Sequence, residues 1–220
     1  GLHHSCNFPY ISLVSIVGSA LSKLKQAEAN PPPFVAAPKA SFTSFNTIFL
    51  NATSTGANFG SSAIWANTAP ALNFQNNIFV NNSTPSGTGI AAAYRRSTST
   101  LTTYSATSNN NLFYAGVPSA TTAIFTDGTN TYTTLAAYKT GMATRDQGSI
   151  SESPTFLSTI GSASNFLHIN GSVMSAIEGG AANILGITDD FDAEIRQGNP
   201  GYAGTGTSPD IGADEFAGLS

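Results

Sequence analysis

The most regular feature of the chain is a recurring block in which asparagines precede a short apolar and aromatic run. The block reads FNTIFLN at residues 45–51 and QNNIFVN at residues 75–81, and a looser copy, NNNLFY, follows at residues 109–114. Residues rich in Ser, Thr, Gly or Pro follow each copy. Because an apolar run bounded by turn-forming residues is typical of a short buried strand, the sequence predicts three equivalent β-strands.

The spacing of these strands favours a solenoid. About thirty residues separate the copies, which is too far for hairpins, and no clear amphipathic helix lies between them. We therefore predict an all-β fold, a right-handed parallel β-helix whose coils stack about 4.8 Å apart. Chance similarity among the strands of a β-sandwich is the alternative. The stacks expected from the alignment are aliphatic (Ile48, Ile78 and Leu112), aromatic (Phe49, Phe79 and Phe113) and amide (Asn46, Asn76 and Asn110).

The pattern changes after about residue 126. Residues 131–141 (TYTTLAAYKTG) predict a short helix with Thr133 or Thr134 as its N-cap and Gly141 as its C-terminal stop. The sequence then gives way to less regular segments.

Two strand-like pieces follow at residues 153–157 and 166–169, and the chain is rich in loops from residue 186 onward. An irregular closing segment would cover the unpaired backbone of the last coil of a solenoid. Residues 41–220 are therefore predicted to form the coils and the C-terminal cap of one β-helix.

Residues 1–40 do not resemble the coils that follow. Their apolar stretch at residues 10–21 is too short and too rich in serine to span a bilayer, so we interpret it as a strand or helix of the fold. We predict an N-terminal cap or linker here, with a segment unrelated to the repeat as the alternative.

Charged residues are scarce throughout the chain. Only 9% of residues are Asp, Glu, Lys or Arg, whereas 40% are hydrophobic and the net charge is −4. Such a surface suits neutral or glycan-like partners. It argues against nucleic acid, because only eight residues are basic and Arg95-Arg96 is their sole adjacent pair. The single cysteine, Cys6, excludes an intrachain disulfide and a multi-cysteine metal site.

The distribution of these few charges bears on catalysis. Between Ala29 and Thr126 there is no Asp, Glu or His. Glycoside hydrolases use a pair of carboxylates, and polysaccharide lyases need a base beside a group that stabilises a carbanion. The predicted coils cannot supply a carboxylate pair, so no catalytic residues are assigned.

A candidate glycan-binding group consists of Tyr94, Arg95 and Arg96. These residues follow a run of alanines, and the two arginines could clamp an acidic sugar. The alternative is ordinary solvated surface charge.

Other ionisable residues are weaker candidates. Lys139, Arg145 and Asp146 lie on or after the predicted helix, where ion pairs are the simpler interpretation and an active site is the alternative. His168 lies in an apolar stretch and is interpreted as a hydrogen-bonded histidine rather than a ligand.

The acidic residues gather near the C-terminus. Seven of the twelve fall in one stretch: Asp189, Asp190, Asp192, Glu194, Asp210, Asp214 and Glu215. The alternate carboxylates of Asp190 and Asp192 are of a kind that Ca²⁺ sites use, although the glycine-containing loop of an EF-hand is absent. Ca²⁺ is therefore a minor expectation.

Four segments carry a resemblance to a known family. They are residues 153–156 (SPTF), residues 166–180 beginning FLHINGS, residues 190–196 (DFDAEIR) and residues 209–216 (PDIGADEF). In this order they resemble the C-terminal region of secreted bacterial pectate-lyase-like right-handed β-helix proteins, the choice-of-anchor Q type. The resemblance covers residues 41–216.

The resemblance implies export and residence at the cell surface or outside the cell. It also implies a structural clasp in which Arg196 pairs with an aspartate while Asp210 or Asp214 caps turns. The residues assigned to this clasp are Asp190, Asp192, Arg196, Asp210 and Asp214. Because the fold hosts lyases, hydrolases and adhesins, it does not choose among them.

The function expected from the sequence is a non-catalytic extracellular or cell-surface module. It would be adhesin-like, structural or glycan-facing, without a membrane span, and end-to-end pairing of uncapped coils could build filaments. The alternative is a polysaccharide lyase or glycoside hydrolase that acts on acidic polysaccharide.

Overall fold

A computed structural model describes residues 16–17, 41–66 and 71–220 of the chain. The described residues are organised mainly by β-strands, together with one α-helix, α1 (Leu135–Gly141), and one 3₁₀ helix, η2 (Leu101–Thr103). The prediction of an all-β fold is thus confirmed. The predicted N-terminal cap or linker lies outside the described residues apart from β1 (Ile16–Val17).

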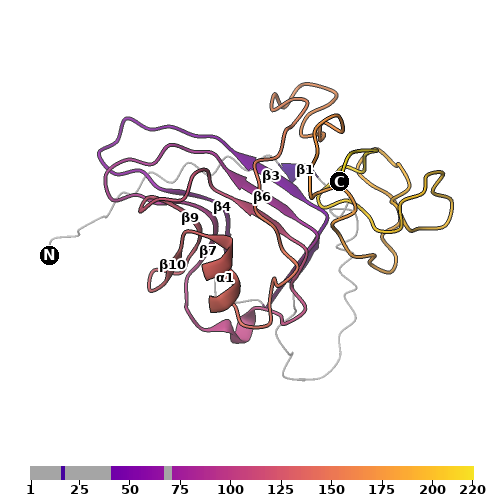
Figure 1. The fold of residues 1–220 in the computed structure, drawn as a ribbon. Helices are drawn as coiled ribbons and strands as arrows, with labels where there is room; N and C mark the ends of the chain where they lie inside the picture. The colour runs from indigo at the N-terminus through magenta and orange to yellow at the C-terminus, as the bar shows by residue number, and fades with distance from the viewer. Residues whose placement is uncertain (1–15, 18–40, 67–70) are drawn as a thin grey trace, which may run out of the picture.

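The strands recur in the same order in three successive passes of the chain (Figure 1). The first pass holds β2 (Ser41–Ser44), β3 (Thr47–Leu50) and β4 (Ser61–Ala66), and the second holds β5 (Leu72–Gln75), β6 (Ile78–Asn81) and β7 (Ala91–Arg96). The third holds residues 104–109, β8 (Leu112–Tyr114) and β9 (Thr122–Thr126).

Each strand pairs in parallel with its counterpart in the next pass. Three sheets result, with the orders β1-β3-β6-β8, β10-β9-β7-β4 and β2-β5. Single parallel bridges from β5 to Tyr104 and Asn109 extend the third sheet. Among the described strands, only β1 and β10 (Thr131–Tyr132) join their sheets in the antiparallel sense.

The register of these strands differs by one residue from the sequence alignment in the first pass. Thr47, not Ile48, pairs with Ile78, and Ile78 pairs with Leu112. Ile48 therefore lies beside Phe79, and the predicted stack of Ile48 on Ile78 is wrong. The expected pairs of the second and third passes, Ile78 with Leu112 and Phe79 with Phe113, are confirmed.

The bend before β3, β6 and β8 sets this register. Phe45, Asn76 and Asn110 occupy equivalent positions there, with φ angles of 53°, 60° and 55°. Asparagine tolerates the left-handed region better than most residues, whereas a phenylalanine there is unusual. The passes are therefore aligned by this bend and not by the similar sequences FNTIFLN and QNNIFVN. As a result, Phe45 of the first pass corresponds to Asn76 and Asn110 in the other two.

The residues after the bend form a buried amide ladder. The Nδ2 of Asn46 donates to Oδ1 of Asn77, Nδ2 of Asn77 donates to Oδ1 of Asn111, and Nδ2 of Asn111 donates to Oδ1 of Asp146, each at 2.9 Å. An amide ladder was predicted, but with Asn76 and Asn110 as members. Those two side chains instead donate to carbonyl oxygens of Ala182 and Gly180 in the C-terminal segment, residues 150–220.

The sheet of β3, β6 and β8 is buried on both faces. On one face Phe79 and Phe113 join an aromatic cluster with Phe74, Tyr94 and Phe125 of the neighbouring strands. Neighbouring rings lie close together, with Tyr94 5.2 Å from Phe125 and 5.4 Å from Phe74 between centroids. Such edge-on packing contributes beyond the burial of area alone.

The other face of this sheet packs against the C-terminal segment. Ile78 and Leu112 contact a second cluster that includes Ile169, Ile177 and Ile211. The aromatic stack predicted for Phe49 with Phe79 and Phe113 does not include Phe49, whose ring meets Phe156 of the C-terminal segment at 5.6 Å.

The C-terminal segment lies in a different place from the one expected. Apart from Ile150, which pairs with β8, it covers the outer face of the β3-β6-β8 sheet and does not close the end of the last pass (Figure 1, orange to yellow). The two strand-like pieces predicted within it contribute only isolated bridges, Phe156 with Ile169 and Ser158 with Phe166.

Helix α1, strand β10 and residues 142–150 cover the third pass. Thr134 is the N-cap of α1 and accepts a hydrogen bond from the backbone N–H of Ala137, which confirms one of the two predicted caps. Tyr138 of α1 is fully buried against Phe113, and the backbone of Ile150 pairs with Leu112. No helix of the described residues has the length and apolar character needed to cross a bilayer.

Candidate functional site

Tyr94, Arg95 and Arg96 are consecutive in β7 and therefore point to opposite faces of the sheet in turn. Tyr94 and Arg96 are 0% and 2% exposed, and Nη1 of Arg96 donates to the Tyr94 hydroxyl at 3.0 Å. Burial raises the pKa of Tyr94 above its ordinary value. The predicted glycan-binding group, in which Arg95 and Arg96 clamp a sugar beside Tyr94, is therefore corrected: Tyr94 and Arg96 belong to the core, and Arg95 alone of the three reaches solvent.

Arg96 is held by groups inside the molecule. Its Nη2 donates to the carbonyl of Thr100 and the hydroxyl of Thr103, and its guanidinium lies 5.4 Å from the centre of the Tyr104 ring. No carboxylate among the described residues lies within ion-pair distance of it. This buried cation is therefore stabilised by neutral acceptors and by the aromatic face beside it.

A residue that the sequence analysis did not consider lies next to Arg95. Trp65 of β4 is the register partner of Arg95 and is 58% exposed. Trp65 and Arg95 are thirty positions apart, which matches the spacing between the repeated blocks of the sequence. This spacing was the signal that could have revealed the pair.

Asp146 forms a second buried network. Its carboxylate accepts hydrogen bonds from the hydroxyls of Tyr104 and Tyr138 at 2.5 and 2.6 Å, and from the side chains of Asn111 and Ser149. Burial raises the pKa of Asp146 as well as those of both tyrosines. With these donors around it, the fully buried carboxylate ends the amide ladder.

The neighbours of Asp146 do not form an ion pair with it. Arg145 instead donates from Nε and Nη2 to the carbonyls of Tyr104 and Leu101. Lys139 lies in the last turn of α1, where a positive charge is favourable. The predicted ion pairs of this group are therefore replaced by hydrogen bonds to backbone and hydroxyl groups.

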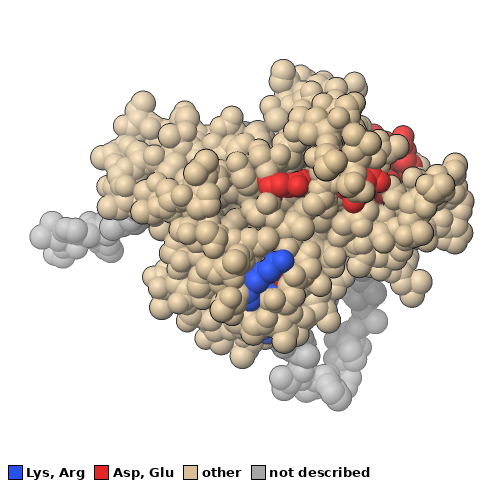
Figure 2. Space-filling view, in the orientation of Figure 1, with Lys and Arg blue, Asp and Glu red and all other residues tan. Residues whose placement is uncertain are grey.

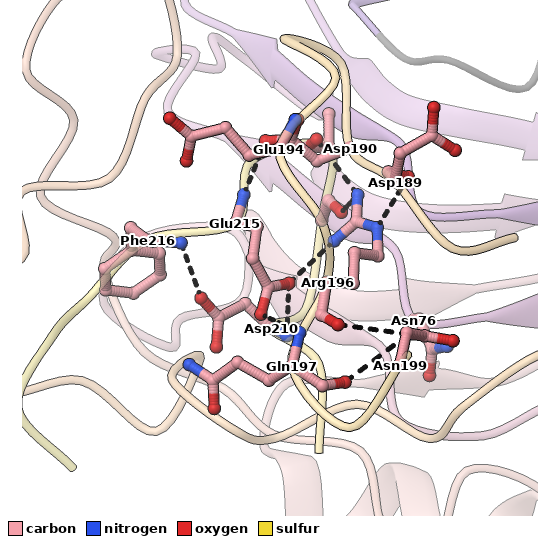
Figure 3. A network of polar contacts seen from close by, with 12 residues as sticks. Asn76, Asp189, Asp190, Glu194, Arg196, Gln197, Asn199, Asp210, Glu215 and Phe216 are labelled. Atoms are coloured by element: carbon pink, nitrogen blue, oxygen red, sulfur yellow. Dashed lines mark hydrogen bonds and ion pairs between the residues drawn. The ribbon is translucent and has the colours of Figure 1, made fainter. Parts of the chain in front are cut away.

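The C-terminal clasp is built around Arg196, which is fully buried (Figure 3). Its Nη1 forms an ion pair with Glu215 at 3.2 Å, and its Nη2 donates to the carbonyls of Gly212 and Ala213. The guanidinium also lies 4.1 Å from the centre of the Phe45 ring. An aspartate partner was predicted for Arg196, but the structure gives it a glutamate that the sequence analysis had counted without assigning a role.

Two aspartates of the clasp hold the backbone around this ion pair. Asp190 accepts hydrogen bonds from the backbone N–H groups of Asp192, Glu194 and Glu215. Asp210 accepts from those of Gly179 and Phe216, at 2.6 and 2.9 Å. These bonds connect the loop at Gly179 and the loop at residues 190–194 to the final stretch of the chain.

Burial of several carboxylates around one guanidinium perturbs their protonation. Desolvation, assisted by the nearby charge of Glu215, raises the pKa of Asp210 to about 8. Burial likewise raises the pKa of Glu215 and lowers that of Arg196. One cation does not neutralise all the acidic groups around it, so Asp210 holds its proton to a higher pH than it would in an unfolded chain.

Asp192 and Asp214 meet at His168 and not at Arg196. The Nε2 of His168 lies 3.1 Å from Asp192, and its Nδ1 lies 3.4 Å from Asp214. Asp214 also accepts the backbone N–H of Ile169 at 2.7 Å, and burial raises its pKa to about 6. This bond joins two distant parts of the chain, so the expectation that Asp214 caps a turn stays a prediction.

The three side chains at His168 offer one nitrogen and two carboxylate oxygens within 4.8 Å of one another. This mixed set suits a transition metal better than Ca²⁺, which prefers oxygen alone. However, each ring nitrogen already faces a carboxylate, an arrangement that also suits a histidine bonded to both. Ca²⁺ at Asp190 and Asp192 stays a prediction, and the structure uses Asp190 for backbone hydrogen bonds.

Comparison of the chain with protein-family models, with curated proteins and with solved structures found no match. The resemblance to pectate-lyase-like proteins therefore stays a prediction from sequence.

Proposed function

We propose that the three passes are coils of a right-handed parallel β-helix. The support is that strands recur in the same order in every pass and pair in parallel with the next pass in two sheets. Crossover connections between parallel strands of one sheet are right-handed in nearly all proteins. The amide ladder, which joins all three passes, is the contact that such stacking would produce.

We further propose that this β-helix is a non-catalytic, glycan-facing module of the cell surface or extracellular space. The observation that carries the proposal is that its buried carboxylates are engaged in internal hydrogen bonds. Asp146, Asp190, Asp210 and Glu215 bind hydroxyl, amide, backbone or guanidinium groups. A glycosidase instead points two carboxylates at one substrate.

One hollow in the described part of the chain supports the same proposal. A hollow of about 180 Å³ lies beside Glu152, the only ionisable residue in its lining. Ligand pockets are typically larger than about 300 Å³, and a single carboxylate does not make a catalytic pair. Most of the surface displayed in Figure 2 is uncharged, which suits a neutral hydroxylated partner.

Two assays test this function. Purified chain is sedimented with insoluble polysaccharides, including cellulose and chitin, and we expect a saturable bound fraction that an unrelated acidic protein of similar size does not show. The chain is also incubated with polyuronates while the absorbance of unsaturated products is followed. Absence of binding to every polysaccharide, or robust turnover of a polyuronate, would overturn the proposal.

The open edges of the first pass bear on self-association. Among the described strands, β2 and β4 each pair on one side only, whereas α1, β10 and residues 142–150 cover the third pass. A filament needs two open ends. We therefore propose pairing through the first pass alone, so that light scattering at rising protein concentration reaches the mass of a dimer. Continued growth beyond a dimer would restore the filament hypothesis.

A further inference from the structure

His168 lies between two aspartates that come from different parts of the C-terminal segment. Its Nε2 lies 3.1 Å from Oδ2 of Asp192, in the loop at residues 190–194, and its Nδ1 lies 3.4 Å from Oδ1 of Asp214, in the final stretch of the chain. One ring nitrogen and one oxygen from each carboxylate lie within 4.8 Å of one another. Three metal-binding side chains from three separate stretches therefore converge.

A small hollow lies where these side chains meet. His168, Asp192 and Asp214 line it together with Phe166 and Phe191, and its volume is about 10 Å³. A space of this size can hold about one water molecule or one ion and is far too small for an organic ligand. The side chains of His168 and Asp192 are 26% and 41% exposed, so an ion can reach the hollow from solvent.

The charges around this hollow favour a cation. Within the described part of the chain, Asp192 and Asp214 form ion pairs with His168 alone, because Arg196 pairs with Glu215. Two carboxylates thus share one imidazole, which carries at most one positive charge. A divalent cation would balance the negative charge that remains.

The distances suit a small transition metal ion. Ligand atoms that lie about 2.0 to 2.2 Å from a tetrahedral zinc ion are roughly 3.3 to 3.6 Å apart. Whichever nitrogen of His168 binds the ion, the carboxylate that faces it lies 3.1 or 3.4 Å away, close to this range. The other carboxylate, within 4.8 Å, needs to approach by about 1 Å.

The second nitrogen of the ring fits the same role. A metal-bound histidine usually donates its other N–H to a carboxylate, which fixes the orientation of the ring. Because both nitrogens of His168 face carboxylates, one can bind the ion while the other donates. A carboxylate has enough lone pairs to accept this hydrogen bond and to bind the ion as well.

We propose that His168, Asp192 and Asp214 bind one divalent transition metal ion, of which Zn²⁺ is the type, with water completing the coordination. The ion ties residues 166–169, the loop at residues 190–194 and the final stretch together, and so fastens the segment that covers the β3-β6-β8 sheet. This site differs in metal and in ligands from the Ca²⁺ site predicted at Asp190 and Asp192. It goes beyond the glycan-facing function and does not depend on it.

Zinc binding by the full chain tests the proposal. His3, His4 and Cys6 are also of the types that bind zinc, so all three are replaced (His3→Ala, His4→Ala and Cys6→Ser) in a reference variant. Calorimetric titration of the metal-free reference variant with zinc chloride should show one ion bound per chain. The midpoint of thermal unfolding should rise with zinc concentration, because an ion that binds only the folded state stabilises it.

Two substitutions in the reference variant locate the ion. Asp192→Asn preserves the shape of an exposed side chain and should weaken zinc binding by more than about tenfold, since changes in the outer shell of a metal site alone cost on that order. Glu194→Gln is the matched control, because it removes one negative charge from an exposed position of the same loop. It should bind zinc like the reference variant, and circular dichroism should show that both variants are folded.

Three outcomes would overturn the metal site. Absence of zinc binding by the reference variant would leave His168 as a histidine held by two aspartates. Equal losses for Asp192→Asn and Glu194→Gln would mean that the general negative charge of the loop attracts the ion. Binding of Ca²⁺ as tight as that of Zn²⁺ would exclude a site selective for a transition metal. None of these results bears on polysaccharide binding, so the metal site and the glycan-facing function can fail separately.

Discussion

Replacing Asn77 with alanine removes the central amide of the ladder. Asn77 is 0% exposed, and its Oδ1 accepts hydrogen bonds from both the backbone N–H and the Nδ2 of Asn46. Its Nδ2 donates to Asn111 and to the carbonyls of Thr43 and Gln75, each at 2.9 Å. Alanine at this position would leave the Asn46 donors and the two carbonyls without that partner.

The expected loss of stability follows from these unsatisfied groups. A buried donor or acceptor without a partner costs about 1 to 3 kcal/mol. Asn111 Oδ1 keeps one bond, from the backbone N–H of Asn77, and water entering the space left by the side chain would recover some of the others. We therefore expect Asn77→Ala to lower the free energy of unfolding by about 3 to 4 kcal/mol.

Asn82 offers a matched control. It lies one residue beyond β6 and is exposed, and its backbone N–H bond to Leu50 does not involve the side chain. Asn82→Ala should change the stability by no more than about 0.5 kcal/mol. The assay is urea unfolding followed by far-ultraviolet circular dichroism at one pH, with equal slopes required for the comparison.

Two results would refute this reasoning. The first is a loss below about 1 kcal/mol for Asn77→Ala, since one unsatisfied buried group alone should cost that much. The second is unchanged hydrogen exchange at the Asn46 backbone amide, because that amide loses its acceptor in the variant. The exchange measurement remains informative if the variant is only partly folded.

Three further predictions concern the buried ionisable groups. In thermal unfolding, Asp146→Asn should lower the free energy of unfolding by about 2 to 4 kcal/mol, because it weakens several charge-assisted hydrogen bonds. Tyr138→Phe should lower it less, because it removes only one of these bonds. Equal losses for the two variants would contradict this order. Arg196→Met should lower the free energy of unfolding by about 3 to 5 kcal/mol, because it leaves Glu215 buried without its cation. A double variant that also carries Glu215→Gln should recover part of this loss. Absence of recovery would show that the broken ion pair is not the cause. Because the folded-state pKa of Asp210 is raised to about 8, the folded chain holds a proton that the unfolded chain releases above about pH 4. Its contribution to stability is therefore full at low pH and is lost as the pH rises to about 8, by about 1.4 kcal/mol per pH unit. Urea unfolding between pH 5 and pH 8 should show this fall, and Asp210→Asn should flatten it; an unchanged slope in the variant would assign the effect to other groups.

The sequence predicted the strands and the helix well but not their alignment. The apolar blocks at β3, β6 and β8 and the Thr134 cap of α1 are local signals that the fold preserves. The one-residue error arose because runs of two and three asparagines can be matched in more than one way. Backbone conformation at Phe45 resolves the ambiguity, and no local pattern announces a phenylalanine with positive φ.

The candidate sites were harder to predict, for two physical reasons. Consecutive side chains on a strand face opposite sides, so Arg95 and Arg96 could not both be exposed, and the strand period itself was the overlooked signal. The pairing of Arg196 with Glu215, and of Trp65 with Arg95, depends on tertiary register. The spacing of register partners varies between passes, from 30 residues for Trp65 and Arg95 to 34 for Ile78 and Leu112.

The amide ladder has a direction. Every bond between side chains of the ladder is donated toward the third pass, and the row stops at Asp146, whose carboxylate accepts without passing a donor along. A pass that brings its own asparagine can therefore be inserted within the row, since it restores one donor and one acceptor. A pass added after Asp146 would meet a group that cannot continue the chain of donation. Lengthening of this architecture by internal duplication is thus compatible with its hydrogen bonding only upstream of Asp146.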